Sequence, residues 1–130
     1  GFVRFANGAR EISGADYARG LAERHLLNRV MTLFFEEHEL LLTPTVSAPP
    51  FAAAGPPPGT IGGRAVGPAG FIPFTYPFNI TGHPAASVPA GLDETGMPVG
   101  LQIVGPRFAD SLVLRASALF EAIAPWPSPV

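Results

Sequence analysis

The spacing of apolar and polar positions predicts a long helix near the start of the chain, over residues 14–38. Ser13 and Asp16 have the spacing of a capping box, in which each side chain bonds the other residue's backbone N–H. Further along, apolar side chains recur at i, i+4, i+7 and i+8, which lie on one face of a helix. These side chains are Leu26, Val30, Leu33 and Phe34. We expect this face to pack on the core.

Shorter apolar runs predict strands. Residues 40–43 are mostly apolar and end at Pro44, a pattern typical of a strand buried in a sheet that is covered on both faces. Residues 85–90 and 99–104 predict two further strands, and the segment 91–98 between them predicts a turn. These last two strands should form an antiparallel hairpin.

Two more helices are predicted from signals at their ends. Thr75 can cap a short helix that has Pro77 in its first turn and is ended by Gly82. Asp110 can cap a final helix that ends at Pro125. The face of this final helix that we expect to pack consists of Leu112, Ala116, Leu119, Phe120 and Ile123.

The resulting order is helix, strand, long loop, short helix, strand, strand, helix, which favours an α/β fold. Three nearly apolar strands leave sheet edges that need neighbours, so we expect the chain to expose apolar surface that a further part of the protein would cover. The sequence opens with Gly1 to Phe5 and has no initial Met. This opening suggests a cut inside a longer protein.

Composition narrows the class of protein. Of 130 residues, 47% are hydrophobic and 14% are charged, as is typical of a globular domain. The net charge is -2 and all eight basic residues are scattered arginines, so no basic stripe is present to bind nucleic acid or an anionic membrane. No run approaches the roughly 18 apolar residues of a membrane span, and cysteine is absent. We expect a cytoplasmic protein.

The side chains that could carry chemistry lack the patterns that such chemistry requires. His25, His38 and His83 do not have the spacing of metal ligands, so we expect no metal site. None of the six serines lies in a nucleophile elbow, and Ser87 is typical of a small strand residue. The acidic cluster at 36–39 could bind a cation or supply a base, but it is more typical of a solvated helix end.

The densest aromatic stretch follows a loop at 45–70 that is rich in Pro, Gly and Ala. It comprises Phe71, Ile72, Phe74, Tyr76 and Phe78. Such a stretch can belong to the core. It can also form the wall of an apolar pocket, because ligand sites are concave, mostly apolar and often built from loops beside a sheet.

Several blocks of the sequence resemble the C-terminal region of amidase-signature enzymes. They are residues 39–45, with Leu40-Leu41-Leu42-Thr43-Pro44, the stretch from Phe74-Thr75-Tyr76-Pro77 to Pro89-Ala90-Gly91, and Gly96-Met97-Pro98-Val99-Gly100-Leu101-Gln102-Ile103-Val104-Gly105. Their order and spacing agree with the family from about Ser13 to Trp126. The resemblance implies that residues 1–130 are the C-terminal part of one α/β/α domain with a mixed sheet.

The resemblance also implies hydrolysis of carboxamides by a Ser nucleophile, a second Ser in a cis peptide and an unprotonated Lys, without a metal or organic cofactor. This chain contains no Lys and no Gly-Ser-Ser-Gly type segment. We therefore assign no catalytic residue to it and expect the catalytic groups upstream. The missing N-terminal part of the same domain would then be its partner, and a homodimer is a further possibility.

What remains for this chain is the substrate side. In the amidotransferase subunits of this family that handle glutamine, an acidic residue occupies the position of Ile72. An apolar side chain there predicts a neutral or apolar amide substrate, with Phe71, Ile72, Phe74 and Thr75 lining its pocket. Two alternatives stay open: a non-catalytic remnant that binds a partner or ligand, and a fragment of an amidotransferase A-type subunit.

Overall fold

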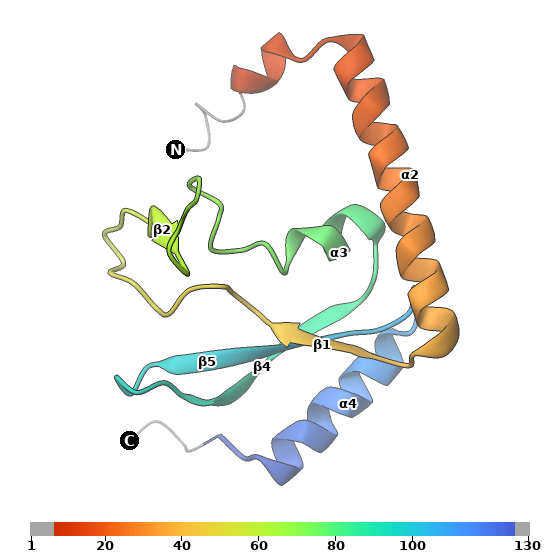
Figure 1. Cartoon of the computed structure of the whole chain (residues 1–130). Coiled ribbons are helices and arrows are strands. Elements are labelled where there is room, and N and C mark those ends of the chain that lie inside the picture. Colours follow the sequence, from red (N-terminus) through yellow and green to blue (C-terminus); the bar gives the residue numbers. More distant parts are fainter. Residues whose placement is uncertain (1–6, 127–130) are drawn as a thin grey trace.

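The computed structural model describes residues 7–126 and has the predicted α/β fold (Figure 1). The elements are η1 (Ala9–Glu11), α2 (Gly14–Glu37), β1 (Leu41–Pro44), β2 (Thr60–Ile61), β3 (Arg64–Ala65), α3 (Tyr76–Thr81), β4 (Ala85–Leu92), β5 (Pro98–Val104) and α4 (Asp110–Ile123). Residues Gly1 to Phe5, on which the expectation of an internal cut rests, lie outside the described residues. No helix of the described part is long and apolar enough to cross a membrane.

The sheet that carries the fold has three strands in the order β1-β5-β4, all paired antiparallel. The predicted hairpin is confirmed as β4 and β5. Gln102 of the central strand lies opposite Thr43 on one side and Ser87 on the other. Because side chains alternate along a strand, these three residues share one face of the sheet.

β1 differs from the expectation of a strand covered on both faces. It lies at an edge of the three-stranded sheet, and Leu42 is 58% exposed. The prediction was wrong for the described residues because an apolar run records that a strand needs cover, but not which segment provides it.

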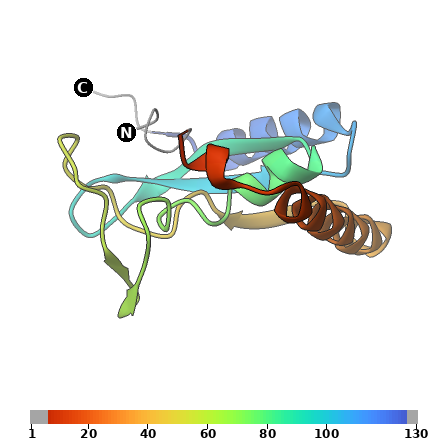
Figure 2. The same cartoon turned by 90° about the horizontal axis from the view of Figure 1, so that it is seen from above.

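The sheet lies between two helical layers (Figures 1 and 2). α4 contacts β4 and β5, whereas α2 and α3 pack together. The core is the cluster of Met31 from α2, Phe78 from α3 and Val104 from β5. The N-terminal half of α2 extends away from this body (Figure 1). The segment 45–70, predicted as a loop throughout, contains the small β2–β3 ribbon, which projects from one side (Figure 2).

The start of α2 is confirmed, but its predicted buried face is wrong. The Asp16 backbone N–H donates to Ser13 Oγ at 3.1 Å, and the Ser13 N–H donates to Asp16 Oδ2 at 3.2 Å. Leu26, Val30 and Leu33 are more than half exposed. The side chains that pack on the core are instead Leu27, Met31, Phe34 and Phe35. α2 is apolar on both sides, so spacing alone could not select the side that meets the sheet.

The other two helices begin where predicted, but without the predicted caps. Thr75 is the residue before α3, yet its hydroxyl donates to the Ile72 carbonyl at 3.1 Å instead of accepting from a helix N–H. Gly82 ends α3 as expected, at a φ of 72°, which favours glycine. Asp110 is the first residue of α4 and Ala109 precedes it, so the Asp110 carboxylate faces the helix dipole and does not cap.

α4 also turns a different face to the sheet. Val113 is buried, whereas Leu119 and Ile123 are more than half exposed. Leu112, Ala116 and Phe120 of the predicted face are half-buried. The prediction was therefore correct for part of the face only, because an apolar arc wider than the contact does not show where the contact is centred.

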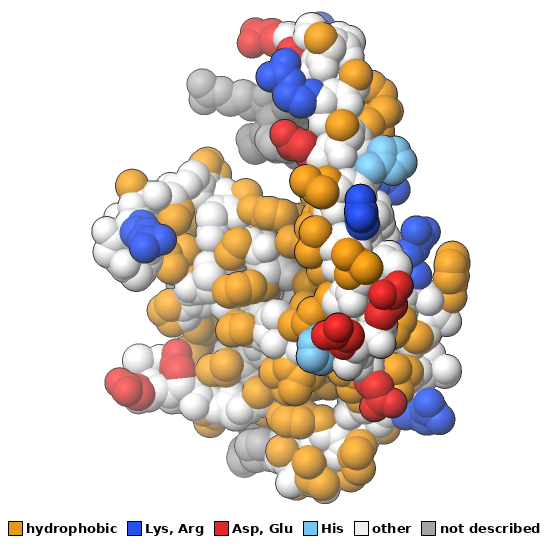
Figure 3. Space-filling view, turned by 45° about the vertical axis from the view of Figure 1, so that its right-hand side comes forward, with side chains coloured by type: hydrophobic (Ala, Val, Ile, Leu, Met, Phe, Trp, Pro, Cys, Tyr) orange, Lys and Arg blue, Asp and Glu red, His pale blue; other side chains and the backbone are white. Residues whose placement is uncertain are grey.

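The expected exposed apolar surface is present. Figure 3 shows hydrophobic side chains along α2 and across the body beside it. The exposed set includes Leu26, Val30, Leu33, Leu42, Leu114, Leu119 and Ile123. A monomeric soluble protein rarely exposes so much continuous apolar surface.

Candidate functional site

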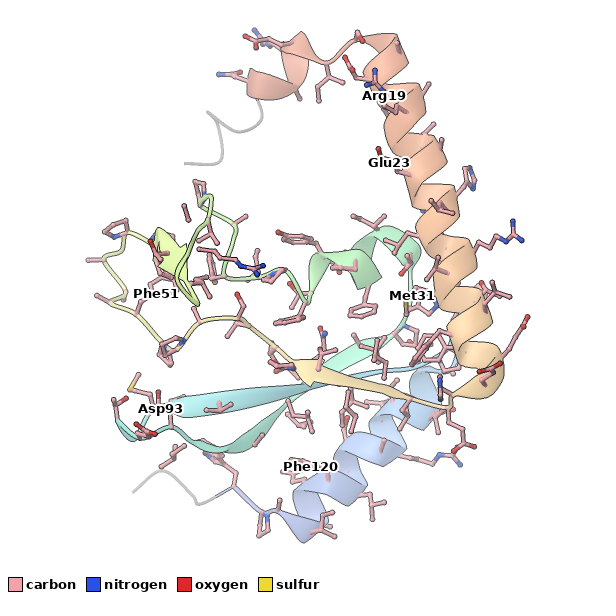
Figure 4. The ribbon with its side chains drawn as sticks, viewed as in Figure 1. Arg19, Glu23, Met31, Phe51, Asp93 and Phe120 are labelled. Atoms are coloured by element: carbon pink, nitrogen blue, oxygen red, sulfur yellow. The ribbon has the colours of Figure 1, made fainter. Side chains whose placement is uncertain are left out.

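A pocket of about 590 Å³ opens where two loop segments meet the tip of the hairpin. Figure 4 shows Phe51 on one of these segments and Asp93 at the hairpin tip, on the same side of the molecule. The lining residues are Pro44, Val46, Ser47, Ala48, Pro49, Pro50, Phe51, Phe71, Phe74, Asp93, Pro98, Val99 and Gly100. The wall is thus aromatic and aliphatic, as in many small-molecule sites.

The structure brings two of the four predicted site residues into this pocket. Phe71 and Phe74 line it. Ile72 and Thr75 are half-buried and lie outside the lining set, in the turn that leads into α3. There the Thr75 hydroxyl and backbone N–H both donate to the Ile72 carbonyl.

Phe51 is a wall residue that the sequence did not reveal. Its ring meets that of Phe71 edge to face, with centroids 5.2 Å apart. Ser47 holds the two segments together: its backbone N–H donates to the Phe71 carbonyl at 3.0 Å, and its hydroxyl donates to the Gly70 carbonyl at 3.0 Å. A serine in a Pro-rich run carries no signal of a partner more than twenty residues away.

The one ionisable side chain in the lining set is already engaged. Asp93 Oδ1 accepts from the Thr95 N–H at 2.8 Å, the Thr95 hydroxyl at 2.7 Å and the Met97 N–H at 2.9 Å. The hydrogen bond from the Thr95 side chain, followed by that from Met97, lowers the pKa of Asp93. The carboxylate is therefore ionised near neutral pH and serves its own turn.

Behind the pocket lies a polar row on the sheet. Gln102 is 4% exposed, and its Nε2 donates to Thr43 Oγ1 and to the Phe74 carbonyl, each at 2.8 Å. Ser87 Oγ lies 2.6 Å from Thr45 Oγ1. A serine paired with another hydroxyl has no base to activate it, which fits the interpretation of Ser87 as a strand residue.

His83 is buried on the far side of the core from this pocket wall, beside a smaller hollow of about 260 Å³ that Arg107 also lines. Its Nδ1 lies 2.7 Å from Thr81 Oγ1, whose own proton goes to the Pro77 carbonyl. Nδ1 is therefore the donor, and the ring is neutral. Burial, and then the charge of Arg107, lowers the pKa of His83.

His25 and His38 lie on α2 and at its end, away from His83, and none of the three histidines joins a metal-binding group. Across residues 7–126 no group of three or more His, Asp or Glu side chains is placed to hold a metal ion. The acidic cluster at 36–39 is exposed, as a solvated helix end would be.

Comparison with known proteins agrees with the fold and the motifs: the chain belongs to the amidase family, whose model, described as Amidase, matches residues 2–114. It is 34% identical over 126 residues to an acylamidase of Rhodococcus erythropolis, covering 95% of this chain and 26% of that protein. It is also 34% identical over 113 residues to the A-type subunit of the Glutamyl-tRNA(Gln) amidotransferase from Dehalococcoides mccartyi, covering 85% and 21%.

The fold matches that of a solved family member. The structure of a bacterial aryl acylamidase of the amidase-signature family superposes with a TM-score of 0.85 at 36% identity, covering 95% of this chain and 26% of that one. The chain thus spans about a quarter of the length of the relatives that it matches.

Proposed function

We propose that this chain is the C-terminal part of an amidase that hydrolyses the C–N bond of neutral or apolar carboxamides, and that it supplies one wall of the substrate pocket. The observation that carries the proposal is the pocket between Phe51, Phe71 and Phe74, whose single carboxylate is engaged in its own turn. The family membership supports the reaction, and the pocket supports the substrate class.

In this proposal the chemistry takes place on groups outside the chain. A Lys accepts the proton of a nucleophilic Ser through a bridging Ser, and the Ser oxygen attacks the amide carbonyl while backbone N–H groups stabilise the oxyanion. The amine leaves with a proton, and water then releases the acyl group from the Ser. The absence of any Lys in this sequence supports an upstream location for these groups.

The wall described here favours substrates without charge. An ammonium group in the pocket would need an acceptor to replace its hydration. Ile72 provides none, and Asp93 Oδ1 already accepts three hydrogen bonds. Burying an aromatic ring against this wall would contribute roughly 2 kcal/mol, or about 30-fold in affinity.

The exposed faces of α2, α4 and β1 support a second part of the proposal, that the rest of the same domain covers them. Their side chains are apolar and contiguous with the core, and the chain spans about a quarter of its relatives' length. A second copy of the protein is the alternative cover.

The experiment is a comparison of kcat/KM in the full-length protein for benzamide, acetanilide and hexanamide against glutamine. We expect at least one apolar amide to exceed glutamine by tenfold or more. A preference for glutamine would overturn the proposal and favour the second candidate, an amidotransferase A-type subunit, which the 34% identity to such subunits supports.

The wall itself is tested by Phe74→Ala, which should raise KM for the preferred aryl amide about tenfold, because a large apolar contact is lost. Phe108→Ala makes the same chemical change at a side chain that is 89% exposed and outside the pocket. It should leave KM unchanged. Equal effects of the two substitutions would remove Phe74 from the site.

A further inference from the structure

We propose that Gln102 is a positioning residue that fixes the width of the apolar pocket by holding two of its walls at once; this inference rests on the proposed function. Gln102 lies on the central strand β5 and is almost completely buried. It does not line the pocket itself. Its effect on substrate must therefore pass through other residues.

The first wall is held directly. Nε2 of Gln102 donates to the Phe74 carbonyl at 2.8 Å, in the segment that immediately precedes α3. This hydrogen bond joins the sheet to the backbone of a pocket residue. The other bonds of the turn at 72–75, from Thr75 to the Ile72 carbonyl, are internal to it and do not fix its distance from the sheet.

The second wall is held through one intermediate. The same nitrogen donates to Thr43 Oγ1 at 2.8 Å, and the Thr43 hydroxyl donates onward to the Pro44 carbonyl at 3.0 Å. Pro44 and Phe74 both line the pocket, and so does Gly100, two residues before Gln102 on the same strand. One buried amide group is thus bonded toward two walls from directly behind the floor.

The chemistry of the amide is what this position requires. A primary amide nitrogen has two hydrogens, and here each has an acceptor. Methionine would fill a similar volume without donating, and glutamate would present only acceptors to two oxygens. Either substitution leaves the Phe74 carbonyl without its partner in a buried place, so the wall should move to find another.

The test uses the full-length protein with Gln102→Met and Thr43→Val, and with Thr43→Ser as the matched control. Gln102→Met releases both walls, Thr43→Val releases only the Pro44 wall, and Thr43→Ser keeps the hydroxyl. We expect KM for the best aryl amide to rise about fivefold or more in Gln102→Met and less in Thr43→Val. Thr43→Ser should match the wild type. For acetamide, which is too small to fill the pocket, kcat/KM should be unchanged in all three.

A purely structural role would lower the activity toward both amides in parallel, and that result, or an unchanged KM in Gln102→Met, would overturn the inference. Isothermal titration of the aryl amide gives Kd without turnover. A higher Kd in Gln102→Met than in wild type therefore supports the inference even if wild-type protein hydrolyses no aryl amide, in which case the proposed function alone has failed. If Gln102→Met does not fold, the ordering of Thr43→Val and Thr43→Ser decides.

Discussion

His83 shows how one buried side chain acquires a defined protonation state. Its ring stacks on Phe35 with centroids 5.2 Å apart, and Nδ1 must donate to Thr81 Oγ1 because the threonine proton is used elsewhere. A second proton on Nε2 would place a cation in a buried site beside Arg107. Burial is the larger cause of the lowered pKa.

This state predicts a pH-dependent stability. Because the folded pKa lies below the ordinary value of 6.5, the unfolded chain binds more protons than the folded chain just below that pH. The contribution of His83 is thus fully present above pH 6.5 and is lost as the pH falls from there toward the folded pKa. We expect the free energy of unfolding, measured with urea at pH 7.5, 6.5 and 5.5, to fall by at most about 1.4 kcal/mol per pH unit from this group.

His83→Gln is the control, because glutamine does not titrate. It should lower stability at pH 7.5 and flatten the dependence between pH 7.5 and 5.5. An identical slope in the wild type and His83→Gln would show that another group titrates.

The site could be predicted from the sequence in part. Phe71 and Phe74 stood out because aromatic residues cluster after a long loop. Phe51 and Gln102 did not, since each gains its role from a partner far along the chain. Ile72 and Thr75 were assigned by the resemblance alone, and their place outside the pocket lining leaves their assignment a prediction.

The helices were predictable in extent but not in orientation. Caps and breakers are local, so Ser13, Asp16 and Gly82 located the ends of α2 and α3. The buried face of α2 depends on where the sheet lies, and Leu26, Val30 and Leu33 had the same helical spacing as the residues that pack. Local physics therefore determined the elements, and tertiary packing determined their facing.

The capping box of α2 gives a prediction at the scale of the element. Ser13→Ala removes the acceptor for the Asp16 N–H, which should cost the first turn about 1 kcal/mol and speed hydrogen exchange there about fivefold. The start of α2 projects from the body, so Tm should change little (Figure 1). Ser13→Thr keeps the hydroxyl and should exchange like the wild type. Unchanged exchange in Ser13→Ala would mean that the cap adds nothing.

The whole molecule is defined as much by what it exposes as by what it buries. An edge strand with Leu42 in solvent and two helices with apolar outer faces are the features of one part of a larger core. The need for cover was predictable from the apolar runs. The identity of the cover was not, because a burial pattern records only the chemistry of the partner surface.

The central claim is that this chain shapes the substrate site while the nucleophile lies elsewhere in the protein. A serine-reactive fluorophosphonate, applied to the full-length protein and followed by digestion and peptide mass spectrometry, tests it directly. The account predicts an adduct on a serine upstream of Gly1 and none on the six serines of this chain. A stoichiometric adduct on any of the six, Ser87 above all, would contradict it.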